Sequence, residues 1–277
     1  MYIKKFLCAL IFVVLLAGCA YCESNKIGVL AKLNLTQEEL SKLINDNKQS
    51  GIYQKFSSGL STGDSSFIYY DSLMSLLMAL NSGEVSEIQL PEDVADYVLN
   101  VNDAYRISSI IRMSRNFYLS FGFRASDNPE LRNKFNDALL SMKADGTILI
   151  LQEKYIADAG LDAPEPVKFA HYDNIDKTIK VAVTGDMPPI DFISESGTPA
   201  GFNTAVLSEI GKRLKINIEL VNIDAGARAA ALASGRVDTV FWFQALKDVT
   251  QQADVPENIT LSEPYYYWNE VLALVKK

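Results

Sequence analysis

The residues in this sequence that could carry out acid–base or nucleophilic chemistry are few and scattered. The single histidine, His171, lies in a Pro-, Asp- and Ala-containing segment, and Cys8, Cys19 and Cys22 all lie within the first 22 residues. No carboxylates are spaced as an acid–base pair, and no His, Cys, Asp and Glu residues are spaced as metal ligands. We therefore expect a protein that is not an enzyme and has no metal or cofactor.

The N-terminus has the organisation of a secretory signal. Two lysines precede an apolar run over residues 6–16, which is too short to anchor a protein across a bilayer. The following Leu16-Ala17-Gly18-Cys19 resembles the lipobox of bacterial lipoproteins. We expect cleavage before Cys19 and lipid attachment to its thiol, which would place the protein outside the cytoplasm on a membrane anchor. The alternative is an ordinary secretory signal that is cut after a small residue.

Composition limits the function classes. The 277 residues carry 34 acidic and 26 basic side chains, a formal net charge of −8. Because nucleic-acid-binding domains usually present a basic surface, this balance argues against a nucleic-acid partner. With 48% hydrophobic residues there is enough apolar material for one large domain or two modest ones.

The hydrophobic pattern alternates between strand-like and helix-like segments in both halves of the chain. Strands are expected at 26–31, 67–70, 85–90, 117–124, 179–184, 216–221, 237–243 and 271–275. Helices are expected at 36–45, 72–81, from 91 onward, 127–143, 147–155, 201–214 and 225–233. Thr36 begins a capping box, Asp71 is the expected cap of the second helix, and residues 157–177 have the composition of a linker. This alternation is typical of an α/β protein with mainly parallel sheets.

One joint between a helix and a strand occurs twice. ALNSGEVSEI at residues 79–88 is nearly repeated as ALASGRVDTV at residues 231–240. Each copy ends an Ala/Leu-rich helical run with Ser-Gly and then begins an apolar alternation. A glycine there can take the left-handed conformation that ends a helix, so both halves are expected to contain the same helix–turn–strand unit.

The second half resembles a known family. Pro188-Pro189, Gly201-Phe202, the joint from Leu232 to Asp238 and Ser262 through Tyr266 are similar to the first lobe of bacterial periplasmic solute-binding proteins of the polar amino-acid type, family 3. The first half resembles the other lobe of that family through Tyr70-Asp71-Ser72-Leu73, the joint at 79–88, and residues 118–147. The resemblance implies a two-lobed, type II periplasmic-binding-protein-like α/β fold.

The lobes occur in reversed order relative to the family, which suggests a natural circular permutation. The expected organisation is a signal peptide over 1–18, a lobe-two-like domain over 24–117, a hinge strand and return helices over 118–156, a linker over 157–177, and a lobe-one-like domain over 178–277. A rival interpretation is two half-modules of a longer tandem ancestor. Permutation also predicts that only one covalent strand, near 117–124, crosses between the lobes.

The resemblance transfers ligand contacts to several positions. These are Asp186, Phe192, Asn203, Trp242, Gln244 and Tyr265. Asn203 stands where the family has Asp after Gly-Phe, and a plain helix cap is an equally good interpretation of it. The run Tyr265–Trp268 could stack a ligand or simply pack between the lobes.

Two ligand-binding residues of the family pattern are missing from this sequence. The family's carboxylate-binding Arg is absent from residues 244–248, and its lobe-two Asp falls at Pro91. Arg228 could replace the missing carboxylate-binding Arg. The alternative is that Arg228 is an ordinary surface arginine. Glu92 or Thr36 could supply the lobe-two contact, although Thr36 is equally explained as a cap.

The resemblance implies a monomeric, membrane-tethered protein that captures a small polar ligand, an amino acid or a related anion, for an ABC permease. The alternative is a ligand-sensing or partner-binding module of the same fold that does not serve transport.

Overall fold

A computed structural model describes residues 26–30, 66–127, 129–157, 159–161, 165–173, 175, 178–194, 197–246 and 258–277. Within the strands, only the backbone is described at 66–67, 111–117, 242–246 and 269. The expected helix at 36–45, its cap Thr36, the loop after it and Cys19 lie outside the described residues.

A mixed nine-stranded sheet runs through the protein. Its strands follow the order β2 (Ser66–Tyr70), β1 (Lys26–Leu30), β3 (Glu87–Pro91), β12 (Tyr266–Lys276), β4 (Tyr105–Arg124), β10 (Thr239–Leu246), β5 (Thr178–Val183) and β9 (Asn217–Asn222), and β11 (Ile259–Leu261) also pairs with β4. The pairs β2–β1, β1–β3, β10–β5 and β5–β9 are parallel, whereas β4 and β12 pair antiparallel with their neighbours.

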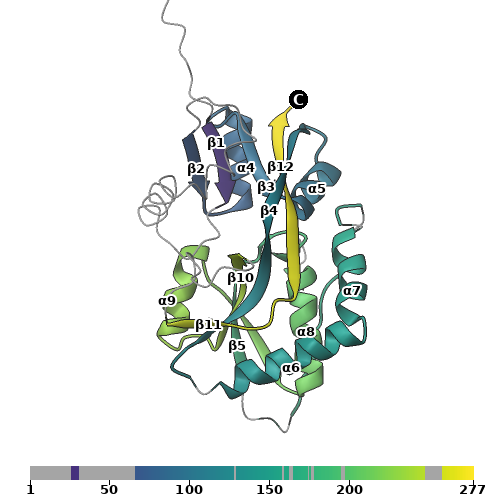
Figure 1. The fold of residues 1–277 in the computed structure, drawn as a ribbon, viewed down its shortest axis with the longest axis vertical. Coiled ribbons are helices and arrows are strands. Elements are labelled where there is room, and N and C mark those ends of the chain that lie inside the picture. The colour runs from purple at the N-terminus through teal and green to yellow at the C-terminus, as the bar shows by residue number, and fades with distance from the viewer. Residues whose placement is uncertain are drawn as a thin grey trace, which may run out of the picture.

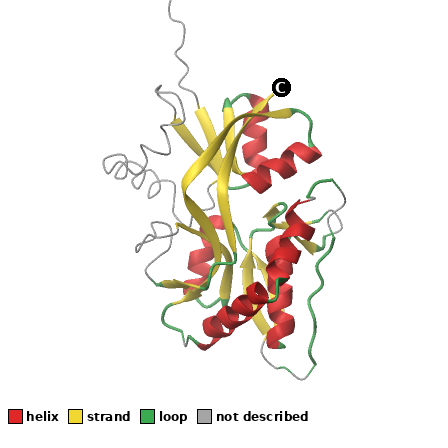
Figure 2. Ribbon diagram, turned by 45° about the vertical axis from the view of Figure 1, so that its right-hand side comes forward, coloured by secondary structure: helices red, strands yellow, loops and turns green. Residues whose placement is uncertain are grey.

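The two parts of this sheet, each covered by its own helices, form two domains (Figures 1 and 2). The upper domain consists of β1, β2 and β3, the helices α4 (Leu73–Ser82) and α5 (Glu92–Val101), and the adjoining ends of β4 and β12. The lower domain contains the remaining strands, with α6 (Glu130–Ala144), α7 (Thr147–Gln152), α8 (Phe202–Leu214) and α9 (Arg228–Ala233). It also carries a small sheet of β6 (Asp186–Met187), β7 (Asp191–Ile193) and β8 (Pro199–Ala200). The expected α/β class with helix-flanked sheets is confirmed.

Two strands, not one, cross between the domains. Residues 266–268 of β12 pair with 117–119 of β4 in the lower domain, and residues 270–276 pair with 105–112 in the upper domain. Figure 1 shows both strands side by side along the molecule. The prediction of a single covalent crossing is therefore wrong, because the aromatic run after Tyr265 and the apolar run at 271–275 belong to one continuous strand.

The repeated sequence does form the same joint twice. Gly83 ends α4 with φ of 78°, and Gly235 follows α9 with φ of 76°. In the first copy the N–H groups of Glu84 and Val85 donate to the Ala79 carbonyl at 3.0 and 3.4 Å. In the second copy the N–H groups of Arg236 and Val237 donate to the Ala231 carbonyl at the same two distances. Both glycines thus supply the left-handed backbone that lets the chain leave a helix and enter a strand.

One sequence-based boundary needs correction. The cap of α4 is Ser72, whose hydroxyl accepts from the N–H of Ser75 at 3.1 Å, and not Asp71. The expected linker at 157–177 also packs along the lower domain. Val167 donates its N–H to Pro199, and the Ser208 hydroxyl donates to the Lys168 carbonyl at 2.9 Å. The backbone groups of Val167 and Lys168 are thus paired with the domain, which composition alone could not indicate.

The helices expected at 147–155 and 225–233 are each divided. The first is α-helical to Gln152 and continues as a π-helix over Glu153–Ala157, and the second begins with a 3₁₀ turn over Ala225–Ala227.

A large hydrophobic cluster extends through both domains. At its lower end the ring of Phe121 packs against Phe135, Phe241 and Tyr265, with the stacked Phe121 and Tyr265 centroids 4.9 Å apart. A second cluster, which includes Leu232, lies under α9. The two clusters bury different faces of the lower sheet, so α8 and α9 cover it from opposite sides.

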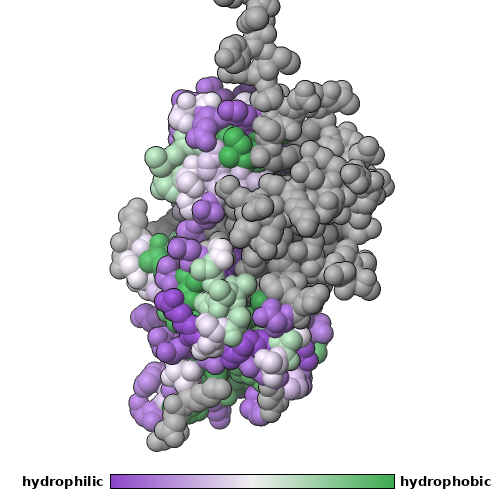
Figure 3. Space-filling model, turned by 90° about the vertical axis from the view of Figure 1, so that its left-hand side faces the viewer, coloured by the Kyte–Doolittle hydropathy of each residue, from purple (hydrophilic) through white to green (hydrophobic). Residues whose placement is uncertain are grey.

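On the face that Figure 3 shows, hydrophilic and hydrophobic residues of the described chain lie interspersed. No helix in the described part of the chain is both long enough and apolar enough to cross a membrane.

Candidate functional site

The upper and lower domains meet along α5. The Tyr97 ring of α5 lies 6.3 Å, centroid to centroid, from Phe192 of the lower domain. Further along the helix, the Asn100 side-chain amide donates to the Ala159 carbonyl at 2.9 Å. The first turn of α5, the middle of β12 and the loops around β7 therefore form the described part of the domain boundary.

Asp93 is the main polar anchor at this boundary. Its Oδ2 accepts hydrogen bonds from the Tyr266 hydroxyl and from the Trp268 indole Nε1, the latter at 2.9 Å. Burial raises the pKa of the Asp93 carboxyl, and the two hydrogen bonds oppose that rise. Burial and the adjacent Asp93 carboxylate also raise the pKa of Tyr266. The carboxylate thereby fixes two rings of the crossing strand against the upper domain.

Negative charge gathers around this anchor. The pKa of Glu92 is raised by burial first, and then by the neighbouring Asp93, Glu270 and Asp96 carboxylates. Burial also raises the pKa of Asp96. Carboxylates that raise one another's pKa in this way create a negative potential, which favours a cationic group at the edge of α5.

The loop from β5 to β7 carries two of the expected contacts. Asp186, half-buried at the start of β6, pairs with Phe192 across the small antiparallel sheet. Asp191 holds this loop, because its Oδ2 accepts from the N–H groups of Thr184 and Gly185 at 3.2 and 3.3 Å. The structure places Asp186 and Phe192 side by side in the small sheet. Asp191 is a structural residue that the sequence analysis did not identify.

The start of α8 is packed tightly against the same loop. Gly201 has φ of 100°, and a Cβ there would lie 2.7 Å from the carbonyl oxygens of Pro189 and Ile190. Those carbonyls accept from the N–H groups of Phe202 and Asn203 at 3.0 and 2.8 Å. Gly201 is also the N-cap residue, so the interpretation of Asn203 as the helix cap is wrong.

Asn203 and Tyr265 lie together in the core of the lower domain. The Tyr265 hydroxyl donates to Asn203 Oδ1 at 3.0 Å, and both side chains are buried. Asn203 Nδ2 is buried without a hydrogen-bond partner. A buried amide donor without an acceptor is costly, and it is a candidate contact for a bound group.

Arg228 is buried completely, so its interpretation as a surface arginine is wrong. It begins α9, and its Nη1 donates to the Phe241 carbonyl of β10 at 3.1 Å. It therefore lies on the α9 side of the lower sheet, whereas Asn203 and Tyr265 lie on the α8 side. The structure thus places these candidate contacts on two faces of one sheet.

The remaining candidates are placed only in part. Glu92 lies beside Asp93 at the start of α5. Trp242 and Gln244 belong to β10, but their side chains, like Thr36, lie outside what the structure describes. Asp93 itself was missed, because an acidic residue in a first helical turn is normally explained by the helix dipole.

Within the described ranges, no three or more His, Cys, Asp or Glu side chains are grouped so that they could hold a metal ion.

The fold and the boundary define a two-domain α/β protein whose domains share two crossing strands. Residues 179–277 match the model of the bacterial extracellular solute-binding proteins, family 3. These residues comprise most of the lower domain and the whole of β12. The resemblance drawn from their motifs is confirmed for this part of the chain.

Solved structures also match, at low identity. One is the ligand-binding component of an ABC-type import system from Staphylococcus aureus with zinc bound, at 12% identity and a TM-score of 0.43, covering 89% of this chain and 65% of that chain. Another is the periplasmic aliphatic sulphonate binding protein SsuA from Escherichia coli, at 10% identity and a TM-score of 0.40, covering 91% of this chain and 64% of that chain. A third is the VFT2 domain of Bordetella pertussis BvgS, at 13% identity and a TM-score of 0.40, covering 91% of this chain and 79% of that chain.

The chain spans slightly less than two thirds of the length of the Staphylococcus aureus structure. The comparison with curated proteins found no match.

Proposed function

We propose that this chain is an extracytoplasmic solute-binding lipoprotein, which captures a small polar ligand between its two domains for an ABC permease. The observation that carries the proposal is the match of residues 179–277 to a solute-binding family. The two crossing strands support it, because a pair of strands between two domains can act as the hinge that closes them around a ligand.

We further propose that the ligand lies at the boundary between α5 and the loops of the lower domain. Asp186 and Phe192 on one side and Glu92 on the other would contact it, together with Trp242, Gln244 and Thr36. The negative potential at the start of α5 suits a ligand ammonium group. Arg228 lies against the backbone of β10 one residue before Trp242, which supports a role for its guanidinium toward a ligand carboxylate at the end of that strand.

A calorimetric screen of the purified mature protein against free amino acids, small carboxylates and short peptides tests the proposal. We expect one class to bind with a Kd in the micromolar range or below and to raise the Tm. Glu92→Gln should weaken an amine-bearing ligand, whereas Glu263→Gln at an exposed site should leave its affinity unchanged. Failure of every class to bind would contradict solute capture.

The lipid anchor is a separate proposal that rests on the motif at Cys19. In a bacterial host, the full-length protein should partition with membranes and incorporate a labelled fatty acid. Cys19→Ser should abolish both while leaving the folded domains intact. Membrane partition of the Cys19→Ser protein would refute this anchor.

We also propose that the domain order is a circular permutation in a monomer. The positions of Lys26 and Lys276 support this, because both residues lie at the same edge of the upper domain. Lys26 begins β1 beside Ser86, and Lys276 pairs with Tyr105 after β12 has passed β3. Two strand spacings separate β1 from β12, which is about 10 Å. A dimeric mass in sedimentation would favour the rival of two half-modules.

A further inference from the structure

A pocket lies at the base of the lower domain, away from the domain boundary. It has a volume of about 510 Å³, and its walls include Phe123, Pro129, Leu131, Arg132, Asp238 and Thr260. It lies where β4 ends and where α6 and β10 begin. β4 crosses between the domains near residues 112–117 and rises about 3.3 Å per residue, so this end lies well below the boundary.

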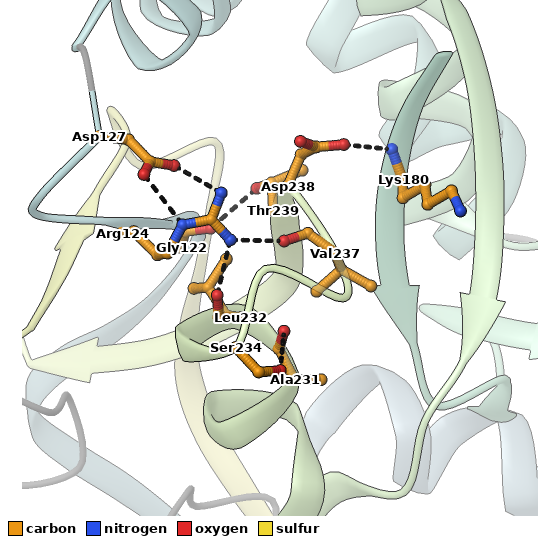
Figure 4. A network of polar contacts seen from close by, with 10 residues as sticks. All are labelled: Gly122, Arg124, Asp127, Lys180, Ala231, Leu232, Ser234, Val237, Asp238 and Thr239. Carbon is orange, nitrogen blue, oxygen red and sulfur yellow. Dashed lines mark hydrogen bonds and ion pairs between the residues drawn. The ribbon is translucent and has the colours of Figure 1, made fainter.

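Arg124, one of the two arginines in this pocket, has a structural role. Arg124 pairs with Asp127 through Nε and Nη2 at 2.9 and 2.7 Å, and its Nη1 donates to the carbonyls of Leu232 and Val237 at 2.7 and 2.9 Å (Figure 4). It thereby ties the end of β4 to the joint between α9 and β10. The charges of Arg124 and Asp127 cancel one another.

The other two charges of the pocket are not paired in this way. Arg132 has a buried Nε without a hydrogen-bond partner, and within the described part of the chain its guanidinium forms no ion pair. Asp238 accepts from the Lys180 N–H through Oδ2 at 2.9 Å, as Figure 4 shows, which leaves Oδ1 available. A buried N–H of a guanidinium without an acceptor is a costly arrangement unless a bound group satisfies it.

We propose that this pocket binds a small zwitterion, with the carboxylate of the ligand at Arg132 and its ammonium group at Asp238. A simple anion would satisfy Arg132 but would face Asp238, and a simple cation would satisfy Asp238 but would face Arg132. A ligand with both charges satisfies both side chains, while Phe123 and Leu131 provide an apolar wall. The volume is in the range of small-molecule sites, which is roughly 300–1,000 Å³. This site is independent of solute capture between the domains.

Amide chemical shifts of the ¹⁵N-labelled protein locate binding directly. Glycine and L-alanine are titrated to millimolar concentration, with acetate and methylammonium as probes of single charge. We expect the two zwitterions to shift the amides of residues 123–127, 130–132, 238 and 260 in a saturable way, and the single-charge probes to bind at least about tenfold more weakly. Shifts confined to α5 and residues 184–193 would report the boundary site alone and would contradict the proposal.

Two variants and a matched control test the assignment. Arg132→Gln and Asp238→Asn should each weaken glycine binding at least about tenfold, and Asp238→Asn keeps an oxygen for the Lys180 N–H. Arg236→Gln, at an exposed arginine near the same pocket, should have no effect. The proposal is wrong if neither zwitterion moves these amides, if acetate binds as well as glycine, or if the two pocket variants bind like the wild type.

Discussion

At the scale of single residues, Asp93 connects the upper domain to the crossing strand. Its carboxylate is buried, yet two ring donors, Tyr266 and Trp268, satisfy the same oxygen. Glu92 and Asp96 raise the local negative charge further. The residue therefore has both a structural role and an electrostatic one.

We predict that Asp93→Asn flattens part of the dependence of stability on pH. The pKa of Asp93 is raised above its ordinary value of 3.8, so the folded state binds more protons than the unfolded state between those values. The contribution of Asp93 to the free energy of unfolding is then greatest below pH 3.8 and falls as pH rises through the raised pKa. An asparagine removes this titration but retains an acceptor oxygen. Urea unfolding at a series of pH values measures the difference.

Asp137→Asn, at an exposed site on α6, is the control for that measurement and should reproduce the wild-type profile. If Asp93→Asn also followed the wild-type profile, the raised pKa would have no part in the stability of the boundary.

Arg228 gives a second prediction at this scale. Arg228→Ala should lower the free energy of unfolding by about 2–4 kcal/mol, because it removes a fully buried side chain and the donor to the Phe241 carbonyl. Arg236→Ala, at an exposed arginine eight residues later, should change stability by less than about 0.5 kcal/mol. Equal effects in denaturant titration would show that the buried contact does not stabilise the domain.

At the scale of elements, the start of α8 depends on one glycine. We predict that Gly201→Ala destabilises the protein by about 2–4 kcal/mol, because the new Cβ would meet two carbonyl oxygens at 2.7 Å and the residue has φ of 100°. Gly226→Ala is the matched control, since a Cβ there has nothing within 4 Å. Its effect should stay within about 0.5 kcal/mol. Thermal unfolding of both variants decides whether this close approach positions α8.

Elements with a strong local signal were predicted well. The two joints were located correctly, because a left-handed glycine after an Ala/Leu-rich helix is specified by neighbouring residues. β1 and β2 agree with the structure to within one residue at each end. Longer strands were predicted less well. β4 covers 20 residues, and only its second part, 117–124, was expected. The pairing of β4 with β12 and β10 extends it beyond what its own sequence pattern shows.

At the scale of the whole molecule, the two crossing strands decide how the domains are connected. β12 ends in the upper domain, paired between β3 and β4, and Lys277 donates its N–H to the Ala104 carbonyl. The C-terminal strand thus holds the upper sheet together as well as crossing to it. Loss of this strand would separate β3 from β4.

We predict that the chain can be reconnected in the family's order. A short Gly/Ser linker from Lys277 to Lys26, with new ends opened between Leu161 and Glu165, should give a folded monomer with the same circular dichroism spectrum. The expectation rests on Lys26 and Lys276 lying at one edge of the upper sheet, about 10 Å apart across two strand spacings. An insoluble or partly folded product would contradict the permutation.

The sequence by itself determined the α/β class, the repeated joint and the resemblance of residues 179–277 to solute-binding proteins, because these depend on local spacing and motif. Only the tertiary structure decided that Arg228 is buried under β10, that Asp93 receives the hydrogen bonds of Tyr266 and Trp268, and that two strands cross between the domains. Each of these joins residues that are distant along the chain. Their contacts follow from strand pairing and helix packing, which a local pattern does not specify.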